Sequence, residues 1–348
     1  MGSIEVWVGM VVWVSLTVYV LSGGADFGGG IWDLLARGPR AKAQREAIAH
    51  AIGPIWEANH VWLILAVVLM FVCFPKGFAV LSIALHIPLS IMLIGIVLRG
   101  SAFVFRAYDR KTDEVQRRWS RVFAIASVVA PFMLGVCVGA VVSGRIRINP
   151  TTGGLSSGFL EAWLAPFPMA VGLLTLALCA LLAAVYLTVE VTELELREDF
   201  RRRALGAGVA TGLVAWATLS LAKRGAPQVW ESLSSSPWAF TFQAVTALSA
   251  LGTMGALWRR RFQLARVLVI LQVVLILAGW ALSHGALSLD PYLVVPDLTF
   301  KEAAAPESVL RAVLITLGIG SLLLGPAFLF LYSVFKRADV EPGSASHG

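Results

Sequence analysis

The sequence predicts an all-α polytopic membrane protein, and two features of the chain indicate this class. Of the 348 residues, 58% are hydrophobic and only 14% are charged, which is more apolar surface than a soluble domain of this length buries. The apolar residues also form nine long runs, with the basic residues gathered in the short segments between them. The net charge of +7 is therefore interpreted by position along the chain and does not indicate a nucleic-acid partner.

Each of the nine runs is long enough to cross about 30 Å of hydrocarbon as a helix. We expect these helices at roughly 5–24, 56–75, 78–98, 121–143, 163–189, 205–222, 238–257, 263–283 and 310–335. The sixth and seventh are the weakest, because Gly, Thr and Ser interrupt them. The first run lacks the basic start and the cleavage site of a signal peptide, so we expect it to be retained.

These helices predict a single integral-membrane domain over 1–336. Helices 1–4 occupy about 5–143, helices 5–8 about 163–283, and helix 9 about 310–335. The polar segment 337–348 is expected to be a flexible cytoplasmic tail.

Loop charges orient the predicted helices. If the N-terminus lies outside, 21 of the 28 Lys and Arg residues fall on the inner side, in alternating loops and the C-terminal tail. Cytoplasmic loops carry such an excess of basic residues. The segment 99–121 holds seven of them, Arg99 included, and we interpret it as an inner loop. The sequence thus predicts a multi-pass protein of the bacterial inner (cell) membrane, with its N-terminus outside and its C-terminus in the cytoplasm.

One stretch at the predicted inner end of the second helix combines polar and aromatic side chains. Trp56, Glu57, Asn59, His60 and Trp62 stand directly against the apolar run. Glu57 and His60 are three residues apart and therefore share a helix face. An ionisable group at this depth is typical of proton handling. The alternative is an interfacial anchor, since Trp and a nearby carboxylate commonly hold a helix end at the membrane boundary.

A glycine-rich segment ends the first predicted helix, over 23–33. Its glycines, Gly28, Gly29 and Gly30 among them, are poor helix formers. They allow another backbone or a cofactor to approach closely, or the helix to break. The segment also brings Asp26 and Asp33 to the same side of the membrane as Glu57. For both the alternative is a solvent-exposed carboxylate at a helix end, and for Asp33 we favour it.

No metal or cofactor site is assigned to this chain. Of the five histidines, His60 is the best candidate ligand, and His86 is expected near the centre of the third helix. No two histidines are placed across one site. The three cysteines lie in apolar runs and are interpreted as small packing residues.

Taken together, the two motifs resemble subunit II of the cytochrome bd-type quinol oxidases, including the cyanide-insensitive branch. The first is Gly24–Gly30, which reads Gly-Ala-Asp-Phe-Gly-Gly-Gly, and the second is Ile52–Leu63, which contains Trp-Glu-Ala-Asn-His-Val-Trp. The second motif is highly specific, whereas the first alone is not. Chain length and the nine helices fit throughout, but motif identity is confined to roughly the first 100 residues.

The resemblance implies an electrogenic quinol:O₂ oxidoreductase of the respiratory chain, with this chain not catalytic alone. Its fold would be two four-helix bundles plus a peripheral helix. The partner would be a haem-bearing subunit I with two b-type haems and one d-type or third b-type haem, which also holds the quinol site. A small accessory subunit and membrane lipid are further expected partners.

In this family subunit II supports assembly, and in some members its acid on helix 2 conducts cytoplasmic protons towards the oxygen-reducing haem. That acid is Asp in some relatives and Glu57 here, and Asp26 matches the family's helix 1 carboxylate. We therefore expect a proton pathway through Glu57, Asp26 and His60. The alternative reading is a proton-coupled secondary transporter, which also uses interrupted helices and intramembrane acids.

Overall fold

The computed structural model describes residues 3–52, 56–108, 113–149, 154–283, 292–295 and 297–338. Within these ranges the chain is almost entirely helical. The helices are α1 (Ile4–Leu34), α2 (Ala41–Ile52), α3 (Trp56–Cys73), α4 (Pro75–Ala84), α5 (His86–Tyr108), α6 (Asp113–Val142), α7 (Pro166–Glu190), α8 (Leu194–Gly225), α9 (Pro227–Ser235), α10 (Ala239–Trp258), α11 (Phe262–Ser283), α12 (Phe300–Ala303) and α13 (Glu307–Ala338). Two short antiparallel strands, β1 (Tyr292–Val295) and β2 (Leu298–Thr299), precede α12.

Eight of the described helices are long and apolar enough to cross a membrane, and the bent pair of α3 and α4 makes a ninth if it is counted as one broken span. This confirms the predicted all-α polytopic class, and the predicted nine spans match the upper of the two counts. The segment 339–348, which contains most of the predicted tail, lies outside the described residues.

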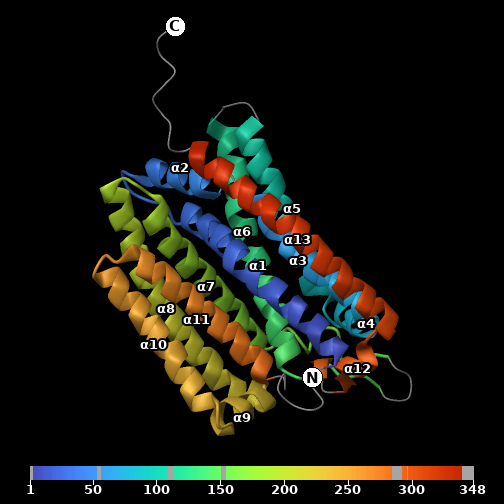
Figure 1. Ribbon diagram of the computed structural model, residues 1–348. Coiled ribbons are helices and arrows are strands. Elements are labelled where there is room, and N and C mark those ends of the chain that lie inside the picture. The colour runs from blue at the N-terminus through green and yellow to red at the C-terminus, as the bar shows by residue number, and fades with distance from the viewer. Residues whose placement is uncertain are drawn as a thin grey trace.

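The spans lie in two groups, with α13 outside both (Figure 1). In the first group α1, α3, α5 and α6 pack together, and in the second α7, α8, α10 and α11 do so. Each group buries its own apolar cluster, represented by Leu69 and Val136 in the first and by Leu182 and Val269 in the second. Contacts of α7 with α1 and α6 join the groups. This is the arrangement that the resemblance implied.

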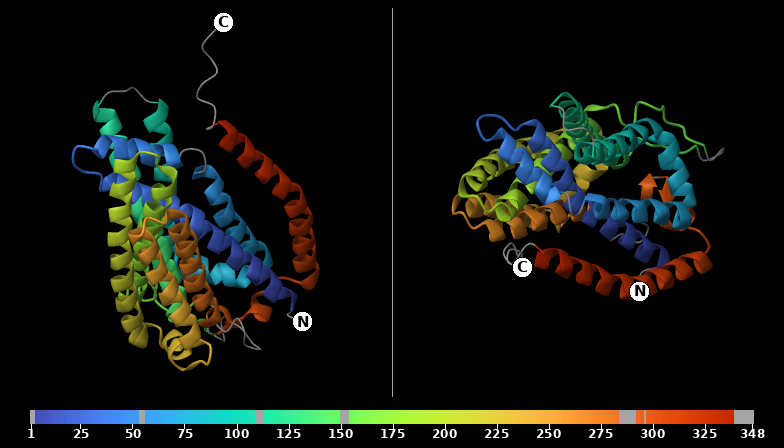
Figure 2. Two further views of the ribbon diagram at one scale, coloured as in Figure 1. Left: turned by 60° about the vertical axis from the view of Figure 1, so that its left-hand side comes forward. Right: turned by 90° about the horizontal axis from the view of Figure 1, so that it is seen from above.

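The last span, α13, is peripheral. Both views in Figure 2 place it on one side of the molecule, outside the two groups. Only 6% of its most apolar window is buried within this chain, and Ile319, Leu322 and Leu323 are exposed. Its apolar surface therefore faces lipid or another chain.

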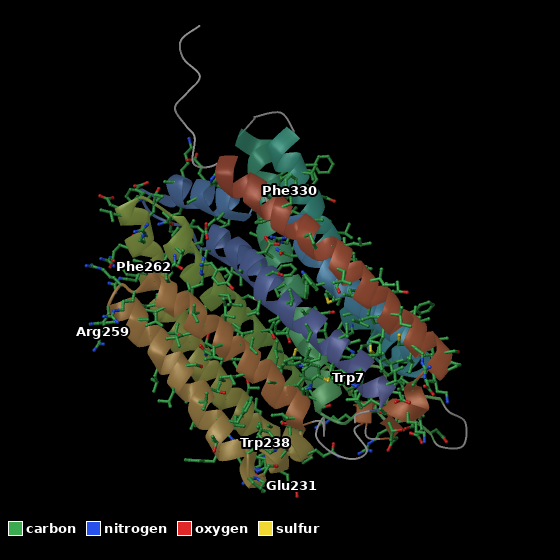
Figure 3. The ribbon with its side chains drawn as sticks, viewed as in Figure 1. Trp7, Glu231, Trp238, Arg259, Phe262 and Phe330 are labelled. Atoms are coloured by element: carbon green, nitrogen blue, oxygen red, sulfur yellow. The ribbon has the colours of Figure 1, made fainter. Side chains whose placement is uncertain are left out.

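The molecule has two ends, which we name after the short helices that lie there. The α2 end holds α2 and the start of α3, and the α9 end holds the start of α1, with α9 and α12 (Figure 1). Figure 3 shows Trp7 and Trp238 towards the α9 end and Arg259 and Phe262 towards the α2 end. Aromatic side chains near both ends are typical of helices that cross a bilayer.

The third predicted helix is misplaced in the sequence reading. We predicted one helix over 78–98. In the structure, the first part of that range belongs to α4, which is bent by 117° from α3, and the next span begins only at His86. Pro75 lacks an N–H and starts α4, while Phe74 before it has non-helical angles of φ −133° and ψ 59°. His86 therefore starts a span and does not lie at its centre. Arg99 lies inside α5, so its assignment to an inner loop is wrong.

The first span is longer than predicted. Because a helix rises 1.5 Å per residue, the 31 residues of α1 extend over about 46 Å. It continues without a break through the glycine-rich segment to Leu34. The glycines therefore serve close approach and not a break.

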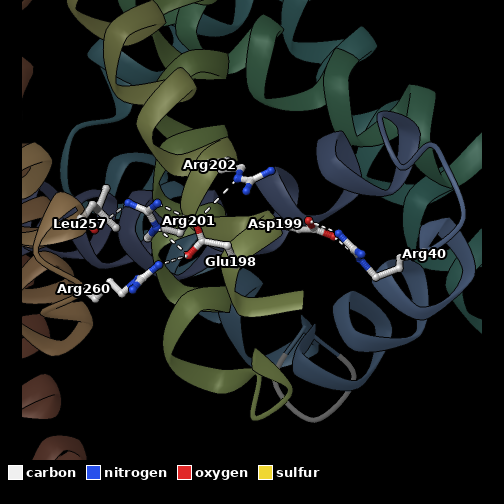
Figure 4. A network of polar contacts seen from close by, with 7 residues as sticks. All are labelled: Arg40, Glu198, Asp199, Arg201, Arg202, Leu257 and Arg260. Carbon is white, nitrogen blue, oxygen red and sulfur yellow. Dashed lines mark hydrogen bonds and ion pairs between the residues drawn. The ribbon is translucent and has the colours of Figure 1, made fainter. Parts of the chain in front are cut away.

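Ion pairs at the α2 end link α8 to two segments that connect other helices (Figure 4). Arg40 contacts Asp199 at 2.7 Å and Glu195 at 3.2 Å, which fixes the segment before α2 to α8. Glu198 pairs with Arg201 at 2.6 Å and with Arg260, in the turn between α10 and α11, at 3.6 Å. Exposed pairs of this kind each contribute little to stability. They join α8 to the segment before α2 on one side and to the turn between α10 and α11 on the other.

Candidate functional site

A buried ion pair connects three spans of the first group. Arg99 of α5 is 1% exposed and Asp26 of α1 is 3% exposed. The Nη2 atom of Arg99 donates to Oδ1 of Asp26 at 2.5 Å, and its Nε donates to the hydroxyl of Ser127 on α6 at 3.0 Å. A charged residue in a transmembrane segment commonly pairs with an opposite charge inside the bundle. Asp26 is therefore an internal partner and not a solvent-exposed helix end.

Aromatic rings complete the surroundings of the Arg99 guanidinium. Its Cζ lies 5.0 Å from the ring centre of Phe27 and 4.9 Å from that of Phe123. A cation over an aromatic face is attracted by the ring quadrupole, more strongly where water is excluded. The guanidinium is thus held by a carboxylate, a hydroxyl and two rings from α1 and α6.

The glycine-rich segment brings α1 close enough to form this site. A side chain at Gly28 would collide with the Cys179 carbonyl of α7, and one at Gly30 would collide with the Ser127 hydroxyl. Gly29 is buried in the same stretch of α1. Close approach of helix backbones in membranes relies on small residues in this way. The predicted close packing of the glycines is therefore confirmed at Gly28 and Gly30.

The second motif places two further polar side chains beside the ion pair. Asn59 of α3 is buried and lies beside the Asp26 carboxylate. The half-buried His60 ring lies 5.9 Å from the ring of Tyr19 and 6.1 Å from that of Phe27, both on α1. Trp62 packs against the apolar cluster that contains Tyr19 and Phe27.

Three buried polar atoms in this region have no hydrogen-bond partner among the described residues. They are Oδ2 of Asp26, Nδ2 of Asn59 and Nδ1 of His60. Buried polar atoms in proteins are almost always hydrogen-bonded, either to protein or to ordered water. One acceptor, one donor and one group that can be either are thus available in the same region.

The structure describes the side chains of only some of the predicted site residues. The backbone of Trp56 and Glu57 begins α3, but their side chains lie outside the described residues. Asp33, which we interpreted as solvent-exposed, is buried, so that interpretation is wrong. The structure brings Asp26, Asn59 and His60 together around Arg99.

Sequence reasoning missed Arg99 and Ser127. The signal was present, since a span begun at His86 and about 20 residues long extends past Arg99. Starting the helix at 78 placed Arg99 at its end, among the basic residues of the loop. Ser127 carries no sequence signal, because a lone Ser in an apolar helix usually bonds its own backbone. Its hydroxyl does so here at 2.7 Å, to Phe123, while it also accepts from Arg99.

His60 and His86 both make contacts within this chain. No group of three or more His, Cys, Asp or Glu residues is arranged to hold a metal ion in the part of the chain that the structure describes. The His60 ring contacts two aromatic rings, and Nδ1 of His86 lies 2.9 Å from the Ile83 carbonyl of its own turn. The histidines at 284 and 347 lie outside the described ranges.

The fold and the buried cluster define a class: a polytopic α-helical membrane protein with a charged site inside one of two four-helix groups. The family model for cytochrome bd terminal oxidase subunit II matches residues 4–335. The chain therefore belongs to the cytochrome bd terminal oxidase subunit II family.

Several relatives are similar to this chain over different lengths. The cytochrome bd ubiquinol oxidase subunit 2 of Bacillus subtilis (strain 168) is 36% identical over 95 residues, which are 27% of each chain. A putative cytochrome bd menaquinol oxidase subunit II of the same strain is 25% identical over 94% of both chains. The cytochrome bd-I ubiquinol oxidase subunit 2 of Escherichia coli (strain K12) is 26% identical over 54% of this chain and 49% of its own length.

A solved structure shares the fold. A chain of the bd oxidase from Geobacillus thermodenitrificans matches with a TM-score of 0.79, over 96% of this chain and 99% of that chain, at 22% sequence identity. The two chains thus share one fold along nearly their whole lengths.

Proposed function

We propose that this chain is subunit II of a respiratory quinol:O₂ oxidoreductase in a bacterial cell membrane. The observation that carries the proposal is the match to the subunit II family along residues 4–335. The relatives are named as subunits of ubiquinol and menaquinol oxidases, so the substrate class is a quinol. Family membership also decides against the secondary-transporter reading.

In this proposal the redox chemistry belongs to a haem-bearing subunit I. That partner would hold two b-type haems and one d-type or third b-type haem, and would bind the quinol. The support from this chain is that His60 packs against aromatic rings and His86 bonds its own turn, so the two do not face each other across one site. Its own contribution is to support assembly of the complex, with which a small accessory subunit and lipid also associate.

The proposed chemical role of this chain is to conduct protons from the cytoplasm through Glu57, His60 and Asp26. We place the cytoplasm at the α2 end, because most Lys and Arg residues lie there. Glu57 starts α3 at that end, and His60 is one helical turn further in. The unpaired atoms of His60, Asn59 and Asp26 are suited to a short chain of water molecules that continues from Glu57.

Asp26 has a different role from Glu57 in this pathway. Its Oδ1 is held by Arg99, so that oxygen is not free to exchange a proton. Its Oδ2 remains available to accept a hydrogen bond. Arg99 thus holds the carboxylate in place, while Oδ2 of Asp26 continues the pathway from Glu57 and His60. The buried charges persist because each is matched by the other.

The proposed activity is tested by purifying the native complex through a tag on this chain. We expect a haem-containing partner to co-purify, a reduced-minus-oxidised spectrum with b-type bands, and quinol-dependent O₂ consumption. A colourless chain that purifies alone and moves a solute across vesicles would overturn the oxidase assignment. Variant His60→Ala should keep the haem content of the complex, because the haems belong to the partner.

A further inference from the structure

A cavity of about 520 Å³ opens at the α9 end, far along the helices from the α2 end. It lies between the end of α6, the segment that follows it, and the junction of α8 with α9. The lining residues that bear on its chemistry are Ser143, Gly144, Arg145, Arg147, Glu161 and Arg224. None of them belongs to the Asp26–Arg99 cluster, so the proposed proton pathway gives the cavity no role.

Three of the lining residues are arginines, at the end of the molecule that is poor in basic residues. Arg147 is partly neutralised, because it pairs with Asp297 at 3.1 Å. Arg145 and Arg224 have no acidic partner within the described part of the chain. Glu161 is the one acid that lines the cavity with them. The cavity therefore carries an excess of positive charge.

The backbone that carries Arg145 is held in one conformation. Gly144 has φ +66°, in the left-handed region that favours glycine. The Ser143 hydroxyl accepts from the Arg145 amide at 3.2 Å, and the side chain of the following residue, Ile146, is fully buried. A backbone that is already ordered loses less conformational entropy when a ligand binds.

The backbone next to Arg224, whose side chain is exposed, is closely packed at the end of α8. The next residue, Gly225, packs so closely on Phe167 that a Cβ there would collide with that side chain. Val142 and Ala222, which are close in sequence to lining residues of the cavity, belong with Phe167 to one buried apolar cluster.

An exposed apolar stripe leads away from Arg224 along the outside of α8. Leu213, Ala217 and Leu221 follow one another at a spacing of four residues. Arg224 comes three residues later, so all four lie on one helix face. Leu213 is 65% exposed and the neighbouring Trp216 is 72% exposed. The stripe is exposed on this chain, and Arg224 stands at its end near the cavity.

We propose that this cavity binds the phosphate group of an anionic phospholipid, with Arg145 and Arg224 donating to its oxygens. Guanidinium groups bind phosphate through charge-assisted hydrogen bonds, often two per group. A free phosphate ion would satisfy the same arginines but would not use the α8 stripe. The stripe, which can hold the acyl chains, is the reason to assign a lipid as the source of the phosphate.

The test titrates the lipid-stripped native complex with dioleoyl phosphatidylglycerol and counts bound lipid by native mass spectrometry. The test variant is Arg145→Gln/Arg224→Gln. The matched control is Lys76→Gln/Lys301→Gln, which removes two exposed charges from the same end. We expect the dissociation constant of the first lipid to rise by about tenfold or more in the test variant and to stay unchanged in the control. Haem content checks that each complex is intact.

Competition with inorganic phosphate identifies the source of the ligand. If millimolar phosphate leaves the first phosphatidylglycerol bound, the lipid assignment stands. If phosphate displaces it from the wild type and binds the test variant weakly, the cavity is a free-phosphate site and the lipid assignment is overturned. Equal lipid affinity in wild type, test variant and control would overturn the phosphate site itself.

Discussion

At the scale of single residues, the Asp26–Arg99 pair is the feature that most constrains the first group of helices. Two opposite charges are buried together at the junction of α1, α5 and α6. Neither charge would be tolerated alone in this environment, because removing one partner leaves the other buried and unmatched. The pair therefore fixes which faces of α1 and α5 meet.

Replacing Arg99 with Met tests this constraint. The variant leaves the Asp26 carboxylate buried without its cation, and breaking a buried pair from one side costs about 3–5 kcal/mol. We expect the purified complex to melt well below the wild type and to assemble in lower yield. The measurement is the thermal midpoint of the complex.

The double variant Asp26→Leu/Arg99→Met serves as its control. It removes both charges, so most of the lost stability should return. If Arg99→Met alone melts at the wild-type temperature, the pair does not hold α1 against α5.

At the scale of helices, the sequence predicts the number of spans but not all of their boundaries. The predicted break at 76–77 lies close to the 117° bend, but 78–98 is apolar apart from two serines and His86, so hydropathy alone does not show that α4 ends at Ala84 and that the next span begins at His86. Pro75 marks the bend, since proline starts helices and breaks them. The misplaced start of the span removed Arg99 from the predicted site. The glycine-rich segment, in contrast, indicated close packing that the structure contains.

Gly28→Ala tests the close contact between α1 and α7. The added methyl group would collide with the backbone carbonyl of Cys179, and overpacking of this kind costs about 1–3 kcal/mol. We expect a lower thermal midpoint and poorer assembly, because α7 joins the two groups.

Gly212→Ala on α8 is the matched comparison. No atom lies within 4 Å of a Cβ at that position, and alanine is favoured over glycine in a helix by up to about 1 kcal/mol. Its midpoint should stay the same or rise. A Gly28→Ala complex as stable as the Gly212→Ala complex would contradict the role of Gly28.

At the scale of the whole molecule, the two groups and the peripheral α13 present a long apolar surface. The outward faces of α3, α5 and α13 carry exposed residues such as Ile64, Val97 and Ile319. These faces are available to lipid and to the proposed subunit I. The sequence predicts the spans that carry them, but not how they face a partner, because a lipid-facing side and a protein-facing side are equally apolar.

The orientation of the molecule is predicted by its charges and is open to direct measurement. Reporter fusions placed after Arg118 and after Ser156 flank the apolar part of α6. The first should report the cytoplasm and the second the opposite side. Two reporters on the same side would contradict the membrane crossing by α6, and exchanged sides would reverse the proposed direction of proton uptake.

The central claim is that Glu57 passes cytoplasmic protons to the oxidase, and one measurement tests it most directly. Steady-state quinol-dependent O₂ reduction is compared between the wild-type complex and Glu57→Gln, which keeps the size of the side chain but removes its titration. Glu57→Asp is the matched variant that retains a carboxylate. With haem content and assembly intact, we predict that Glu57→Gln lowers turnover by about 10²–10⁴-fold, as expected for the loss of a positioned acid–base group, and that Glu57→Asp keeps much of the activity. Wild-type turnover by Glu57→Gln across the pH range would contradict the claim and leave Glu57 as an interfacial anchor.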